Sequence, residues 1–259
     1  MTKTSSIIIS LICLSLIALL FSFSPIAQNI SYHLFADNRY LLFIPNNLNV
    51  ISNIPFLLVG LYGLWVVLSS KSNQIKRELK PELITFFIGV SLVSVGSGYY
   101  HIAPDNQTLI WDRLPMTIAF MALFSVTIGE FISLKYAKPL LIFLLSFGIF
   151  SVVYWSVTEA KGVGDLRFYI LVQFLPMLLI PVFLLLGENN SRSTSGYWQL
   201  IGCYALSKVF EHYDEQTLTL LSEVSGHSLK HIFAAIGIFL YARSYLDKSD
   251  IVERVASSE

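Results

Sequence analysis

The sequence predicts an all-α, polytopic integral membrane protein. Hydrophobic residues make up 54% of the 259 residues, and charged residues only 13%, whereas soluble proteins average about 25% charged residues. Apolar runs long enough to cross a bilayer, which takes about 20 residues, recur along the chain. These two observations together exclude an ordinary soluble enzyme.

Eight candidate membrane helices follow one another, separated by short polar stretches. They are at residues 7–26, 49–69, 83–102, 113–133, 138–157, 167–187, 197–213 and 227–246. The first could instead be a signal peptide, since Lys3 precedes it, but such peptides have only about 7 to 15 apolar residues. We therefore expect a retained N-terminal helix at 1–28, an outward loop at 29–48, a seven-helix domain at 49–246 and a tail at 247–259.

Charge is balanced overall but unevenly distributed along the chain. The net charge is zero, so there is no basis for expecting nucleic-acid binding. Lys and Arg gather in the even-numbered loops and the C-terminal tail, whereas the seventh loop is acidic. By the positive-inside rule we expect cytoplasmic termini and outward odd loops, including the stretches 27–48, 103–112 and 214–226.

Two histidines four residues apart, His227 and His231, open the last apolar segment. On a helix, residues at this spacing share one face about 6 Å apart, and two imidazoles so placed can share a metal ion. Polar side chains are costly in a membrane and usually functional. The pair alone fits a metal site and an ordinary structural role equally well.

Three further residues converge on the same predicted outer side. His101 ends the third apolar segment, and three imidazoles leave one tetrahedral zinc position open for water. Ser97 lies on the same helix face as His101, where it could stabilise an oxyanion. Asp112 begins the fourth segment, and a carboxylate beside a zinc-bound water can accept its proton. The five residues together indicate a hydrolytic zinc site near the outer leaflet.

Each of these residues also has an ordinary structural interpretation. Asp112, with Pro115 in the following turn, has the position of a helix N-cap. Ser97, flanked by two glycines, could be a small residue that permits close helix packing. His101 alone could simply hydrogen-bond a backbone carbonyl.

The motifs resemble those of the alkaline ceramidases, whose superfamily also includes the progestin and adiponectin receptors and the haemolysin-III-like proteins. The family pattern is Ser-x3-His at the end of one helix, then Asp-x-Leu-Pro-Met, then a C-terminal His-x3-His. In this chain the pattern is found at 97–101, 112–116 and 227–231. The stretch 49–53 also resembles the Asn-x-x-Ser-Asn that opens the first family helix, so the resemblance spans about residues 35–245.

The resemblance implies a seven-helix bundle around a zinc ion bound by His101, His227 and His231. Asp112 would position or deprotonate the water, and Ser97 would stabilise the oxyanion. It further implies a ceramide-like lipid substrate, entering from the bilayer and cleaved at its amide to a long-chain amine and a fatty acid.

This chain departs from the family pattern in three places. Its extra N-terminal segment makes the seven family helices the second to eighth here. Before the first of these, the animal enzymes carry an acidic cluster that binds calcium, whereas this chain offers only Asp37 and Asn46. We therefore expect a weak calcium site there at most. Lys230 lies between the two C-terminal histidines, a form that resembles the bacterial members of the superfamily, so we expect the chain to lie in a bacterial inner membrane.

Two other functions fit the same bundle. The receptor branch of the superfamily suggests a sensor with a structural zinc, although the short inward loops leave no domain to pass on a signal. A metal or proton transporter could use the histidines as a relay, but it would need polar groups and broken helices at the bilayer midplane. Lys208, three residues before Glu211, indicates a local ion pair, or alternatively a contact to a lipid headgroup.

Overall fold

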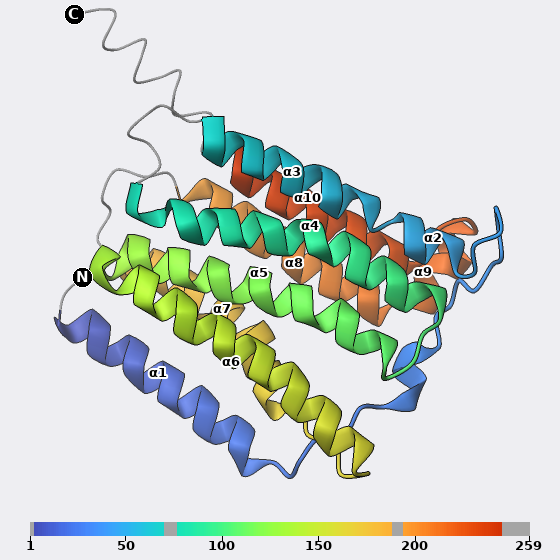
Figure 1. The fold of residues 1–259 in the computed structure, drawn as a ribbon, viewed down its shortest axis with the longest axis horizontal. Coiled ribbons are helices and arrows are strands. Elements are labelled where there is room, and N and C mark those ends of the chain that lie inside the picture. The colour runs from blue at the N-terminus through green and yellow to red at the C-terminus, as the bar shows by residue number, and fades with distance from the viewer. Residues whose placement is uncertain (1–2, 70–76, 188–193, 245–259) are drawn as a thin grey trace, which may run out of the picture.

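The computed structural model describes residues 3–69, 77–187 and 194–244, and this part of the chain folds into helices joined by short loops. In Figure 1 the long helices lie side by side along a common direction, and the short α2 and α9 lie at one end. The elements are α1 (Lys3–Ser22), η1 (Ile30–His33), α2 (Asn47–Ile51), α3 (Ile54–Ser69), η2 (Arg77–Leu79), α4 (Lys80–Ile102), α5 (Thr108–Phe131), α6 (Leu134–Ala160), α7 (Arg167–Leu186), α8 (Ser195–His212), α9 (Asp214–Leu221) and α10 (Gly226–Arg243). The all-α prediction is confirmed.

Six helical segments in the described part are long and apolar enough to cross a membrane, so the chain is a multi-pass membrane protein. They are α1, α2 with α3, and α4 to α7. Helices α8 and α10, which correspond to the last two predicted segments, are less apolar because they carry several charged and imidazole side chains. The count of seven helices plus one therefore stays a prediction.

Helix α4 is central to the bundle. It packs against α3 on one side and α5 on the other, while α5 also contacts α6 and α7, and α10 packs against α8 and α3. The largest core cluster includes Phe87, Leu123, Ile180 and Ala235, on α4, α5, α7 and α10 respectively. Helix α1 contacts α7 and is mostly exposed, at the edge of the bundle (Figure 1). The packing brings the C-terminal end of α4 to the N-terminal ends of α5 and α10.

The structure differs from the predicted segments at two places near this end. The predicted helix at 49–69 is interrupted after Ile51, where the Asn53 side chain donates a hydrogen bond to the Asn49 carbonyl at 2.7 Å. The predicted outward loop at 214–226 contains α9. The first difference involves a side-chain contact to the backbone, which hydropathy does not register.

Candidate metal and active site

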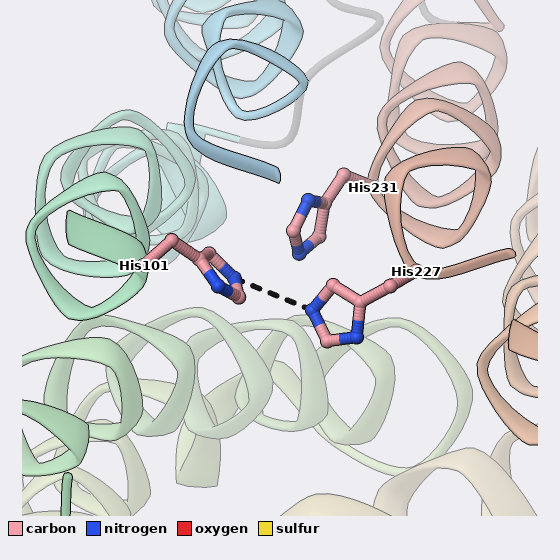
Figure 2. Close-up of side chains that lie close together, drawn as sticks. All are labelled: His101, His227 and His231. Atoms are coloured by element: carbon pink, nitrogen blue, oxygen red, sulfur yellow. Dashed lines mark hydrogen bonds between the residues drawn. The ribbon is translucent and has the colours of Figure 1, made fainter. Parts of the chain in front are cut away.

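Three histidines meet at the end of the bundle where α2 and α9 lie. His101 comes from the last turn of α4, and His227 and His231 come from the first turns of α10 (Figure 2). All three are buried, and one nitrogen from each lies within 4.8 Å of the others. Within the described residues, this is the group of His, Cys, Asp and Glu side chains that could hold a metal ion. The pair from α10 is thus joined by the third predicted ligand.

The geometry of the histidines fits a tetrahedral cation. Nε2 of His101 lies 3.3 Å from Nε2 of His227, the contact drawn in Figure 2. Two nitrogens on a tetrahedral zinc with bonds of about 2.0–2.1 Å are about 3.3 Å apart. In addition, Nδ1 of His101 is buried without a hydrogen-bond partner, so this imidazole is not held as an ordinary buried histidine would be. The donor set, three nitrogens shielded from water, suits a borderline-soft ion such as zinc.

The break between α2 and α3 positions one of the ligands. Ser52 lies in this break, and its hydroxyl is 2.8 Å from Nδ1 of His231. Asn49, one turn earlier, is fully buried, and its side-chain oxygen accepts a hydrogen bond from the Ser228 hydroxyl at 2.9 Å. The sequence of the Asn-x-x-Ser-Asn stretch does not by itself indicate a role. In the fold it holds the first turn of α10.

The first turn of α10 is also capped from two directions. Ser225 is the N-cap residue, and its hydroxyl accepts a hydrogen bond from the Ser228 backbone at 3.2 Å. The Asp214 carboxylate accepts a hydrogen bond from the His227 backbone N–H at 2.7 Å and another from Ala36 at 3.0 Å. A carboxylate at a helix N-terminus is favourable because it satisfies unpaired N–H groups and complements the helix dipole. From the sequence alone, Asp214 is predicted only to belong to the acidic seventh loop.

Ser97 and Asp112 face each other across the α4–α5 contact. The Ser97 hydroxyl is close enough to the Asp112 carboxylate to interact with it, and both side chains are buried. Asp112 is not an N-cap, because α5 begins at Thr108, whose backbone N–H donates to Asp105 at 2.6 Å. The N-cap interpretation is therefore wrong, and Asp112 lies one turn inside the helix.

Close packing at this contact depends on Gly96. A Cβ atom at Gly96 would lie 2.0 Å from the Trp111 carbonyl oxygen. The α4 and α5 backbones can approach only because this residue has no side chain. The neighbouring Ser97 is then directed into the interior of the bundle.

A cavity of about 480 Å³ extends from the site into the bundle. Ser97, His101, Asp112 and His231 line its polar end. The remaining lining is largely apolar and comes from α3, α4, α5, α7, α8 and α10, with side chains such as Phe86, Leu123, Met177, Leu200 and Ile238. Four of the five predicted site residues thus open onto one apolar chamber, and His227 contacts it through His101.

The predicted calcium ligands are engaged in other contacts. Both carboxylate oxygens of Asp37 accept hydrogen bonds from Arg39 at 2.8 Å, and this contact lowers the pKa of the Asp37 carboxyl below its ordinary value. The Asn46 side-chain nitrogen donates to the His101 carbonyl at 2.9 Å. Phe35, nearby in the same loop, packs against His101 and His227 with ring centroids 4.7 and 4.5 Å away. These residues support the histidine site from outside, and a calcium site stays a prediction.

The predicted ion pair on α8 is confirmed and has a third member. Lys208 lies 2.5 Å from one Glu211 oxygen, and Lys230 of α10 lies 2.7 Å from the other. The Lys230 side chain therefore extends from α10 to Glu211 on α8. The Glu211 carboxylate thus binds two ammonium groups. Both lysines line the polar end of the cavity.

Comparison with known proteins identifies a family for this arrangement. The family model described as Ceramidase matches residues 40–210, which is more than half of the chain. The match includes Ser97, His101 and Asp112 and ends before α10. A Dictyostelium discoideum protein, dcd3A, whose name assigns it provisionally to the alkaline ceramidases, is 29% identical over 93 residues. That alignment covers 32% of this chain and 32% of the relative, so about a third of each is compared.

Proposed function

The chain belongs to the ceramidase family, and from this premise we propose that it hydrolyses the amide bond of a ceramide-like lipid within the membrane. The observation that carries the proposal is the meeting of three buried histidines, a buried carboxylate and a buried hydroxyl at the polar end of one apolar cavity. The products are a long-chain amine and a fatty acid.

We propose zinc as the metal, with His101, His227 and His231 as its ligands. A zinc ion bound by three imidazoles lowers the pKa of water to about 7 and polarises a carbonyl group. The three ligands supply no negative charge. Two carboxylates line the cavity, and because Glu211 is bound by Lys208 and Lys230, the buried Asp112 is the one available for proton transfer.

Asp112 acts on the attacking water and the leaving nitrogen, whereas Ser97 acts on the amide oxygen. The Asp112 carboxylate accepts a proton from water while the water oxygen bonds to the amide carbon. It later donates that proton to the leaving nitrogen as the carbon–nitrogen bond breaks. The Ser97 hydroxyl donates a hydrogen bond to the amide oxygen as negative charge develops there. The Ser97 hydroxyl has a single proton, so it turns from the Asp112 carboxylate, with which it interacts in this structure, to the amide oxygen when a substrate binds.

The apolar part of the cavity suits a fatty acyl chain. From His101 to Phe86, both of which line it, α4 rises by about 22 Å at 1.5 Å per residue. That length is more than half of the roughly 30 Å hydrocarbon thickness of a bilayer. A lipid that enters from the bilayer can therefore place its chain along the cavity and its amide beside the histidines.

The same lining weighs against a transport function. A path for a metal ion or proton needs polar groups through the middle of the bundle. Below the histidines this cavity is lined instead by side chains such as Phe86, Leu123 and Met177. Zinc flux into liposomes that depends on His101 would nevertheless establish transport.

Metal analysis combined with a lipid panel tests the proposal. Purified wild type and Asp112→Asn are analysed for bound metal and incubated with lipid amides and the matching esters. We expect zinc in both proteins and amide hydrolysis in wild type, reduced about 10²–10⁴-fold in the variant. His231→Ala should lose both zinc and activity. Wild type without zinc, or a His231→Ala variant with full amide hydrolysis, contradicts the proposal.

A further inference from the structure

Arg113 is a buried cation at the polar end of the cavity. It is only 5% exposed and lines the cavity beside Asp112. Its guanidinium lies over the rings of Trp155 and Tyr169, 4.1 and 4.5 Å from their centroids. Nη2 donates to the Gln28 side-chain oxygen at 2.5 Å, whereas Nη1 is buried without a hydrogen-bond partner. Among the ion pairs of the described residues, none includes Arg113.

The Arg113 guanidinium has an N–H donor group, Nη1, that is available to bind an acceptor. Arginine remains charged in proteins and carries five N–H donors in a planar fork. A buried charge without an opposite charge is costly, and contacts with ring faces offset that cost only in part. The two aromatic rings also fix the plane of the Arg113 fork. A rigid fork with an unpaired donor is well suited to bind carboxylate or phosphate oxygens.

The ion cluster on α8 and α10 carries more positive than negative charge. Glu211 is the single carboxylate shared by Lys208 and Lys230. All three side chains line the cavity, and each is at most about one-third exposed. One ammonium charge in the cluster is therefore not balanced by the carboxylate.

The charged side chains that line the cavity do not cancel. The cations are Arg113, Lys208 and Lys230, and the carboxylates are Asp112 and Glu211, which leaves one positive charge when the histidines are neutral. Arg113, Lys230 and Glu211 all lie close enough to Asp112 to act on its charge. A lipid with a neutral headgroup leaves the positive charge of the cavity uncompensated, whereas a lipid with an anionic headgroup neutralises it.

We propose that the amine half of the substrate carries an anionic group, a carboxylate or a phosphate, which binds Nη1 of Arg113. The proposal rests on the proposed hydrolase function, because it specifies the substrate of the same site. The acyl chain occupies the apolar part of the cavity, so the amine half stays at the polar end with Arg113 and the lysines. Neutral ceramide is then a poorer substrate than an N-acyl amino acid or a phosphorylated ceramide.

Arg113 also has a purely structural interpretation that the test must separate. Its hydrogen bond to Gln28 joins α5 to the segment after α1, so its loss could loosen the protein and lower all activities together. A structural role predicts an equal loss for every lipid. A binding role predicts a loss confined mainly to the anionic ones.

The first experiment compares three lipids with the same acyl chain: a neutral ceramide, a ceramide phosphate and an N-acyl amino acid. The readout is the ratio of kcat/KM for each anionic lipid to kcat/KM for ceramide, measured with zinc-loaded protein. We expect a wild-type ratio above one for at least one anionic lipid, and that lipid identifies the group as phosphate or carboxylate. Arg113→Gln should lower this ratio at least tenfold, Arg113→Lys less, and Lys208→Gln by a smaller factor.

Lys161→Gln is the matched control. It removes one positive charge from an exposed position after α6, outside the cavity, and should leave the ratio unchanged. A wild type that prefers ceramide, or an Arg113→Gln variant with an unchanged ratio, overturns the substrate class while amide hydrolysis stands. A wild type that cleaves none of the three lipids contradicts the proposed function itself.

A binding measurement gives a readout independent of turnover. The thermal midpoint of EDTA-treated protein is measured with dodecyl phosphate, dodecanoate or uncharged dodecanol, so that no anion can bind through a metal. The matching anion is the one with the group, phosphate or carboxylate, that the first experiment identifies. We expect it to raise the thermal midpoint of wild type and of Lys161→Gln more than dodecanol does. In Arg113→Gln this difference should disappear. Equal shifts with the anions and dodecanol in wild type, or a difference that persists in Arg113→Gln, overturn the proposal.

Discussion

The hydroxyl of Ser52 lies 2.8 Å from Nδ1 of His231 and 3.2 Å from the Asn49 carbonyl oxygen. Since a carbonyl can only accept, the hydroxyl donates to Asn49, and its oxygen is free to accept the Nδ1 proton of His231. This assignment, inferred from the hydrogen-bond network, leaves the Nε2 lone pair available to a metal. A residue outside the ligand set thus selects the tautomer of a ligand.

Ser52→Ala should weaken zinc binding without abolishing it. Loss of the hydroxyl frees His231 to rotate and to adopt the other tautomer, and such changes typically cost about 10–100-fold in metal affinity. Competition with a zinc chelator measures the effect. Ser146→Ala is the control, because this exposed hydroxyl bonds only the Ile142 carbonyl of its own helix. Equal affinities in the two variants would argue against the role of Ser52.

Ser97→Ala should reduce kcat while zinc is retained. A single hydrogen-bond donor to a developing oxyanion contributes about 10²–10³-fold to turnover. Steady-state hydrolysis and metal content are measured on the same preparations. Ser91→Ala serves for comparison, since Ser91 lies on the same helix and donates to the Phe87 carbonyl. If Ser97→Ala keeps its kcat, the serine does not bind the amide oxygen.

Gly96→Ala and Gly98→Ala should have opposite effects on stability. The added methyl at Gly96 meets the Trp111 carbonyl at 2.0 Å, whereas at Gly98 nothing lies within 4 Å. We expect Gly96→Ala to cost about 1–3 kcal/mol by overpacking, and Gly98→Ala to gain up to about 1 kcal/mol from helix propensity. Unfolding in detergent measures both. Similar stabilities would show that α4 and α5 can separate at little cost.

The Asp37–Arg39 ion pair should stabilise the loop between η1 and α2 at neutral pH and lose this effect at acidic pH. Arg39 lowers the pKa of Asp37 below its ordinary value of 3.8, so the pair contributes fully above about pH 4, and this contribution is lost as pH falls through the lower folded-state pKa. The thermal midpoint of wild type should exceed that of Asp37→Asn at pH 7, and the gap should narrow below pH 4. A gap that stays constant down to pH 3 contradicts this account.

The features that sequence predicts well are those encoded within a few consecutive residues. Hydropathy located the apolar helices because lipid exposure imposes a composition on each one separately. The four-residue spacing placed His227 and His231 on one face, because helix geometry alone determines this. The motif resemblance then linked them to His101, and the family match agrees for the part of the chain that it covers.

Other features depend on contacts between distant segments. Ser52 and His231 are 179 residues apart, and Arg113 and Gln28 are 85 apart. Asp112 has the sequence position of an N-cap because Pro115 follows in the next turn, yet α5 already begins at Thr108, whose backbone N–H donates to Asp105.

The sequence by itself determined that this is a helical membrane protein with histidines at helix ends and a carboxylate and hydroxyl nearby. Only the tertiary structure decided that Ser52 orients His231, that Lys230 binds Glu211, and that Nη1 of Arg113 is buried without a hydrogen-bond partner. The physical reason is that helix formation and membrane insertion depend on local composition and spacing. The partner of a buried polar side chain, in contrast, is set by which helices pack together, and that is decided by the whole bundle.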